Sequence, residues 1–200
     1  MVWPAPMKTG IFEGVRNNRR RVLSLGLGLG ALTLASGSAS AAARATADET
    51  LKAELAAAEK DGKTLALFVQ ASWCPYCKLF GLLLKDSAAA PVLNAHFRFF
   101  WLNVRERKPE WQKRQLPGAM SVFKRYSGGG ETVPFFAFLD KEGTALSTSN
   151  NPRGQNIGYP GTDEELDWYD AMFAKAAPKM TKAEIATVRA ATVRLYHPKD

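Results

Sequence analysis

The sequence predicts an α/β domain, because helix-like and strand-like segments alternate along the chain. Residues 48–60 have the apolar period of an amphipathic helix. The apolar run at 64–70 has the length of a buried strand, and the aromatic-rich run at 97–104 predicts a second strand parallel to the first. The chain has only two cysteines, and both come directly after the first of these strands.

A helix is expected after the cysteines, over residues 78–85. In it, Phe80, Leu83 and Leu84 have the i, i+3, i+4 spacing of a face that packs on a sheet. Residues 91–96 predict a short helical turn before the second strand. The segment so far therefore runs helix, strand, helix, strand.

The segment 105–130 has the least regular pattern in the chain. It is basic at first, contains a predicted helix at 120–126 and ends in three consecutive glycines at 128–130. Its length exceeds that of an ordinary connection, which is typical of functional or loosely ordered loops. The simpler interpretation is an inserted surface helix and loop.

The second half of the chain predicts a hairpin followed by two helices. Two short strands at 135–139 and 144–148 flank a tight turn that ends in glycine. A turn-rich polar stretch leads to a helix at 162–177, which opens with a capping box and carries an apolar face. Thr181 opens a second capping box and a final helix, with Ile185, Val188 and Leu195 on one side. The apolar face of the helix at 162–177 consists of Leu166, Tyr169 and Phe173.

The formal charge of +8 does not indicate nucleic-acid binding. The first 43 residues contain five basic residues and one acidic residue, so they account for half of the charge excess. The remainder shows no basic helix and no aromatic-basic repeat that could follow a phosphate backbone. We therefore expect no nucleic-acid partner.

Residues 1–43 have the layout of a secretory signal peptide. Three arginines at 19–21 precede a glycine-rich apolar segment at 22–35, and two Ala-x-Ala cleavage sites follow at 39–41 and 41–43. The arginines also resemble a bacterial twin-arginine signal, so both export routes stay open. The apolar segment is too short for a stable membrane anchor. We expect export to an oxidising space, the periplasm.

Cys74 and Cys77 form a Cys-x-x-Cys pair between a predicted strand and a predicted helix, which is typical of a redox dithiol. Unpaired N–H groups and the helix dipole favour an anion at a helix N-terminus. Cys74 is therefore the thiol expected to ionise and to act as nucleophile. Pro75 suits the first helical position, where an N–H would have no partner.

Two other uses of the cysteines are less favoured. A purely structural disulfide between Cys74 and Cys77 would close too small a loop to restrict the unfolded chain much. A zinc site needs about four ligands, and only His96 and His197, both predicted at the surface, could join the cysteines. We therefore predict no metal and no cofactor apart from a redox-active Cys74–Cys77 disulfide.

Two motifs in this element order resemble the thioredoxin-like superfamily, in particular its exported bacterial members. They are Trp-Cys-Pro-Tyr-Cys at 73–77 and Thr-Val-Pro at 132–134, before an apolar strand. The resemblance covers residues 48–177 and implies a thioredoxin-like fold, with a central mixed sheet flanked by helices. Residues 105–130 would then be an insertion before the family's cis-proline, and 178–200 a C-terminal helical extension.

The resemblance also implies roles for individual residues. Cys74 matches the attacking cysteine and Cys77 the resolving cysteine, so these two are the predicted catalytic residues. Pro134 matches a cis-proline whose turn lies beside the dithiol and offers backbone groups to an extended substrate. The predicted substrate-binding residues are Trp73, Pro75, Tyr76, Val133 and Pro134.

Two departures from the family pattern limit what it implies. The Pro-Tyr dipeptide is similar to that of glutaredoxins, but their Gly-Gly segment for glutathione is missing after the 135–148 hairpin. Thioredoxins carry a buried acid six positions before the first cysteine, where this chain has Phe68. The usual proton acceptor for Cys77 is therefore absent from that position.

The predicted function is that of a thiol:disulfide oxidoreductase outside the cytoplasm. Its partners would be protein thiols or disulfides and a redox donor or acceptor. The alternative is a thioredoxin-like peptide-binding module in which the dithiol is vestigial or regulatory. Phe68 and the basic, tryptophan-containing segment 105–130 keep this alternative open.

Overall fold

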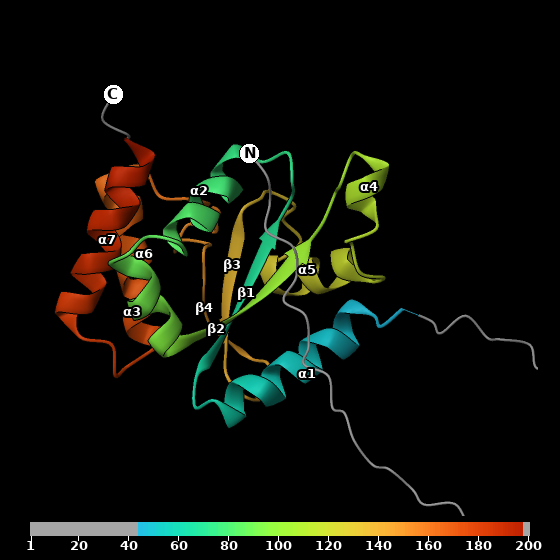
Figure 1. Cartoon of the computed structure of the whole chain (residues 1–200), viewed down its shortest axis with the longest axis horizontal. Coiled ribbons are helices and arrows are strands. Elements are labelled where there is room, and N and C mark those ends of the chain that lie inside the picture. Colours follow the sequence, from blue (N-terminus) through green and yellow to red (C-terminus); the bar gives the residue numbers. More distant parts are fainter. Residues whose placement is uncertain (1–43, 198–200) are drawn as a thin grey trace, which may run out of the picture. The chain divides into compact units, whose positions relative to one another are not determined.

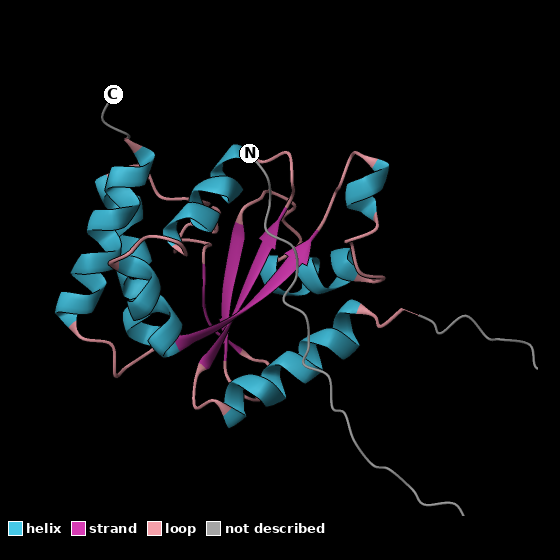
Figure 2. Cartoon of the chain, in the orientation of Figure 1, coloured by secondary structure: helices cyan, strands magenta, loops and turns pink. Residues whose placement is uncertain are grey.

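A computed structural model describes residues 44–197 (Figures 1 and 2). The predicted signal peptide, residues 1–43, lies outside the described residues. The helices and strands are α1 (Ala47–Lys60), β1 (Thr64–Gln70), α2 (Pro75–Leu83), α3 (Ala89–His96), β2 (Phe97–Asn103), α4 (Pro109–Gln112), α5 (Ala119–Ser127), β3 (Phe135–Leu139), β4 (Ala145–Thr148), α6 (Asp163–Ala176) and α7 (Lys182–Tyr196). This order confirms the predicted α/β class.

The strands form one mixed sheet in the order β2-β1-β3-β4 (Figure 2). β1 runs parallel to β2, with Gln70 opposite Asn103, and antiparallel to β3, with Val69 opposite Phe135. The C-terminal ends of β1 and β2 therefore share one edge of the sheet with the N-terminal end of β3. The Cys-x-x-Cys segment, the residues after β2 and the residues before β3 meet at this edge for that reason.

Helices cover both faces of the sheet (Figure 1). Alternate residues of β1 point to opposite faces. Ala66 and Phe68 belong to one core cluster with residues of α2, α3, α6 and α7, whereas Leu65, Leu67 and Val69 belong to a second cluster with α1 and α5. The predicted central mixed sheet flanked by helices is therefore confirmed.

The segment 105–130 differs from the predicted surface insertion. α4 is a short helix with no buried residue, but α5 buries Ala119, Val122 and Phe123 against the sheet. These three residues have the i, i+3, i+4 spacing of a packed helical face. The prediction of a surface helix is wrong for α5, because its apolar residues share one face and pack on the sheet, while Lys124 and Arg125 stay exposed.

Helix α7, which follows the predicted 48–177 domain, packs against α2, α3 and α6. Val188 is buried there, and Ile185 and Leu195 pack against the same cluster, as their spacing predicted. His96 is not the surface residue that the sequence predicted: its side chain is 16% exposed and lies 3.3 Å from the carboxylate of Glu184 on α7. None of the helices between residues 44 and 197 combines the length and the apolar character needed to cross a membrane.

Candidate active site

Cys74 is the N-cap residue of α2, at the junction with the end of β1. Its Sγ accepts a hydrogen bond from the backbone N–H of Cys77, with 3.3 Å between nitrogen and sulfur. The thiol also lies 3.6 Å from the carbonyl oxygen of Val133, to which it can donate. Pro75 occupies the first turn of the helix, as predicted. The first cysteine is thus held at a helix N-terminus, in the geometry expected from the two-residue spacing.

The surroundings make the two thiols unequal. The pKa of Cys74 is lowered to about 7, first by a hydrogen bond with the Cys77 thiol, then by backbone N–H groups and the charge of Lys78, while burial opposes this. The same hydrogen bond and burial raise the pKa of Cys77. When one of the two thiols of the reduced protein ionises, it is therefore that of Cys74, and Cys77 keeps its proton. This agrees with the ionisation expected from the helix terminus, and the catalytic roles of both residues stay predictions.

Phe68 fills its position on β1 with an aromatic ring in the core. Its centroid lies 4.5 Å from that of Phe80, 4.7 Å from Trp101 and 4.8 Å from Phe136. The side chain is fully buried and has no polar atom. This position therefore supplies no proton acceptor to Cys77, as the sequence indicated.

The Val133–Pro134 peptide bond is cis, as the resemblance implied. The side-chain amide of Asn156 donates to the carbonyl oxygens of Thr132 and Pro134, each at 2.9 Å. Asn156 belongs to the loop between β4 and α6 and holds the carbonyls on both sides of Val133. The Val133 carbonyl is left facing Cys74. The structure thus brings the two predicted motifs together at one edge of the sheet.

Residues 105–107 follow β2 and hold the loop that precedes Cys74. The carboxylate of Glu106, only 6% exposed, accepts hydrogen bonds from the backbone N–H of Ser72 at 2.9 Å and from the Ser72 hydroxyl. The indole N–H of Trp73 donates to the Arg105 carbonyl at 2.8 Å. The guanidinium carbon of Arg107 lies 4.1 Å from the centroid of the Trp73 ring, in cation–π geometry. Both the indole N–H and one ring face of Trp73 therefore have a partner.

Pro75 and Tyr76, the two residues between the cysteines, lie at the surface. Tyr76 is 46% exposed, and its ring lies beside that of Tyr196 at the end of α7. The two ring centroids are 6.1 Å apart and the planes differ by 15°. The exposed dipeptide is thus in contact with the C-terminal helix, which the sequence alone did not indicate.

Sequence reasoning missed three residues of this site: Glu106, Asn156 and Tyr196. Each contacts the predicted motifs from a distant part of the chain, and none belongs to a motif of its own. A signal for Glu106 did exist, because it is an acid between two arginines just after a strand parallel to the one that carries the dithiol. The other two left no such signal.

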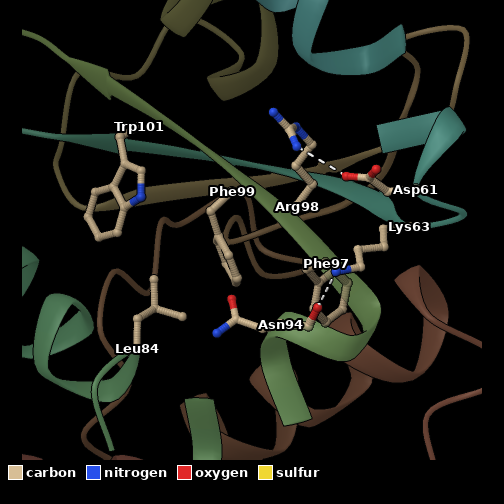
Figure 3. Close-up of a pocket in the computed structure, with 8 residues that line it drawn as sticks. All are labelled: Asp61, Lys63, Leu84, Asn94, Phe97, Arg98, Phe99 and Trp101. Carbon is tan, nitrogen blue, oxygen red and sulfur yellow. Dashed lines mark hydrogen bonds and ion pairs between the residues drawn. The ribbon is translucent and has the colours of Figure 1, made fainter. Parts of the chain in front are cut away.

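A cavity of about 380 Å³ lies beside the edge strand β2, and none of the predicted site residues lines it (Figure 3). Its two cations are paired, Arg98 with Asp61 and Lys63 with the carbonyl of Asn94. A second cavity of about 520 Å³ is bordered by Arg105 and Glu106 and is therefore next to the loop that precedes Cys74. We assign no chemistry to either cavity.

Within residues 44–197, no three side chains of Cys, His, Asp or Glu lie close enough together to hold a metal ion. His96 is paired with Glu184, and the His197 ring centroid lies 4.8 Å from that of Tyr196. Neither histidine is positioned with the cysteines as a ligand set.

Comparisons with known proteins give likenesses of modest strength. The solved structures that resemble the chain include the disulphide isomerase from Xylella fastidiosa Temecula1 (15% identity, 77% of this chain and 94% of that chain, TM-score 0.44). They also include the oxidised C-terminal domain of Neisseria meningitidis DsbD (21% identity, 64% of this chain and 98% of that chain, TM-score 0.41). A DsbH oxidoreductase is similar at 18% identity over 67% of this chain and 83% of that chain, with a TM-score of 0.43. No curated protein matches the sequence.

A family model described as a thioredoxin-like domain matches residues 51–150, which is half of the chain. The matched segment begins in α1 and contains β1 with the dithiol, the cis-proline turn and both strands of the hairpin. The fold and the arrangement of the dithiol beside the cis-proline agree with this match. The chain therefore belongs to the thioredoxin-like domain family.

Proposed function

We propose that this protein is an exported thiol:disulfide oxidoreductase that acts on protein disulfides or dithiols through Cys74 and Cys77. The observation that carries the proposal is the Cys74 thiol at the N-terminus of α2, with its pKa lowered to about 7. The thiolate is the nucleophile of disulfide exchange, and a pKa near ambient pH is the optimum for an attacking thiol. Export, with the periplasm as destination, is supported by the leader sequence alone.

In the first step, the Cys74 thiolate attacks one sulfur of a substrate disulfide. A bond forms between Cys74 Sγ and that sulfur, the substrate S–S bond breaks, and the second substrate sulfur leaves as a thiolate. No oxidant or reductant is consumed, because one disulfide is exchanged for another. The Val133 carbonyl, 3.6 Å from Cys74 Sγ, marks the side on which the cis-proline turn borders the reacting sulfur.

In the second step, the Cys77 thiolate attacks Cys74 Sγ and the mixed disulfide breaks. The substrate sulfur that was bonded to Cys74 leaves as a thiolate, which takes a proton from water, and a Cys74–Cys77 disulfide remains. Cys77 must first lose its proton. The largest cause of its raised pKa is the hydrogen bond with Cys74, and this cause disappears once Cys74 Sγ is part of the mixed disulfide. The substrate thiolate released in the first step is then a base that can accept the proton. This route needs no acid at Phe68.

The test is reduction of insulin disulfides by the mature domain with dithiothreitol as electron donor. Wild-type protein should accelerate the reaction, and Cys74→Ser should reduce the rate to that of the donor alone. Cys77→Ala should instead accumulate mixed disulfides, which non-reducing electrophoresis detects. If wild type and Cys74→Ser have the same rate, the alternative of a peptide-binding module with a vestigial or regulatory dithiol replaces the proposal.

The direction of exchange is set by the redox potential rather than by the geometry of the site. Equilibration with glutathione buffers measures it. A reduction potential of about −120 mV would make the protein an oxidant of substrate dithiols, and one of about −270 mV a reductant of substrate disulfides. In either direction a redox partner must return the Cys74–Cys77 pair to its starting state.

A further inference from the structure

The last residue of α7 contacts the dipeptide between the two cysteines. The Tyr196 ring is nearly parallel to the Tyr76 ring, with centroids 6.1 Å apart, and also to the Tyr159 ring, with centroids 6.4 Å apart and planes at 7°. The neighbouring Tyr76 hydroxyl raises the pKa of Tyr196, so the two hydroxyl groups interact as well. The ring of Tyr196 thus lies beside both the exposed ring of Tyr76 and the buried ring of Tyr159.

The Tyr159 ring, on the buried side of Tyr196, is held in place. Tyr159 is 4% exposed, and its hydroxyl donates to the carbonyl of Thr192 in α7 at 3.2 Å. The Tyr196 ring occupies space next to Gly161 that a side chain would need: a Cβ at Gly161 would lie 2.4 Å from Cζ of that ring. A side chain at residue 161 and the observed ring at 196 therefore exclude each other. The position of Tyr196 therefore depends on the segment 159–161 as well as on α7 itself.

The outer end of the contact is the exposed ring of Tyr76, between the two cysteines. Cys74 is 2% exposed, so a substrate disulfide reaches it only by contacting the residues around it. Tyr76, two residues further along, is 46% exposed and presents an aromatic surface there. A ring that is already held in place loses less conformational entropy when a substrate side chain packs on it. Tyr196 provides that support.

We propose that Tyr196 is a positioning residue that sets substrate specificity by holding the ring of Tyr76, which follows Cys74 by two residues in the motif. The substrates favoured are polypeptides with an apolar or aromatic side chain next to the reacting cysteine. This inference assumes the proposed oxidoreductase function. The segment 51–150 that matches the family contains none of Tyr159, Gly161 and Tyr196. The contact that supports Tyr76 is therefore made by residues outside the matched domain.

The experiment compares two cyclic disulfide peptides that differ only in having Phe or Ser beside one cysteine. Wild type should reduce the Phe peptide with a kcat/KM roughly three- to tenfold higher, the range of one aromatic contact. Tyr196→Ala should bring this ratio below about twofold. Tyr196→Phe should restore it, because stacking needs the ring rather than the hydroxyl. Val193→Ala, which removes a 38% exposed side chain of the same helix, is the matched control and should keep the wild-type ratio.

Several outcomes would overturn the inference. Equal losses of kcat/KM on both peptides in Tyr196→Ala would mean a merely structural role, and unchanged kcat/KM values on both would mean no role. Gly161→Ala should also lower the ratio by displacing the ring, and it serves as the second variant if Tyr196→Ala does not fold. If wild type reduces neither peptide faster than Cys74→Ser, the proposed function itself fails. If it reduces both equally, only the specificity inference fails.

Discussion

The loop that carries Cys74 is held from two sides by different kinds of contact. On one side, residues 105–107 bind Ser72 and Trp73 through a buried carboxylate, a carbonyl and a guanidinium; we call this the polar anchor. On the other, the stacked rings of Tyr159 and Tyr196 support Tyr76; we call this the aromatic anchor. The first reaches the site from the end of β2 and the second from the C-terminal helix.

The two anchors differ in what their removal would leave behind. Deleting the carboxylate of the polar anchor leaves two half-buried donors of Ser72 without their acceptor, and donors that lose their partner away from bulk water cost desolvation energy. Deleting the Tyr196 ring of the aromatic anchor removes a contact of about 0.5–1.5 kcal/mol per pair and leaves no buried donor without its acceptor. The polar anchor is therefore suited to fixing the loop, and the aromatic anchor to adjusting which substrates it meets.

The largest effect is expected from Glu106→Ala, which leaves the Ser72 N–H and hydroxyl without an acceptor. The free energy of unfolding should fall by about 2–3 kcal/mol, measured by urea denaturation of the reduced protein. Glu106→Gln keeps one acceptor oxygen and should lose less.

The matched control is Glu110→Ala, on the exposed short helix α4 of the same segment, which should change stability by less than about 0.5 kcal/mol. If Glu106→Ala proves as mild as this control, the polar anchor does not fix the loop, and the contrast between the two anchors is wrong.

A smaller effect is expected from Gly161→Ala, because the new Cβ would overlap the Tyr196 ring. The free energy of unfolding should fall by about 1–2 kcal/mol. Gly81→Ala in α2 is the control, since a Cβ there meets nothing within 4 Å and should stabilise the helix by about 0.5–1 kcal/mol.

A double-mutant cycle identifies the cause of the Gly161→Ala effect. In a Tyr196→Ala background the ring is gone, so Gly161→Ala should become nearly neutral and give an interaction energy of about 1 kcal/mol. Equal costs in both backgrounds would show that residue 161 tolerates no side chain for another reason, and that the aromatic anchor does not depend on it.

The elements that could be predicted from the sequence are those whose pattern lies within a few consecutive residues. β1 was predicted with its observed bounds, because its apolar run lies between polar residues, and the capping boxes marked the starts of α6 and α7. Cys74 and Pro134 were recognised from short motifs. The anchors were not, because Glu106 lies 34 residues from Ser72 and its contact depends on the register of two parallel strands. Such a contact becomes visible only when the sheet is assembled.

The smallest effect concerns the charge of Cys74, to which neither anchor contributes among the causes that lower its pKa. The rate of alkylation by iodoacetamide should rise with pH around a midpoint of about 7. Because the folded-state pKa lies below that of an unfolded thiol, ionisation stabilises the reduced protein increasingly as pH rises above 7, and this gain is lost as pH falls through 7.

Lys78→Gln tests how much of the lowered pKa of Cys74 comes from the charge of Lys78 on α2. Removing this cation should raise the alkylation midpoint by only a few tenths of a pH unit, because an exposed charge is screened by water and salt. Lys52→Gln on α1, which packs on the other face of the sheet, should leave the midpoint in place. A shift of a full unit in Lys78→Gln would make this charge the main cause of the low pKa. The hydrogen bonds from Cys77 and the first turn of α2 would then be secondary, and the thiolate would depend on the surface of the helix rather than on its N-terminus.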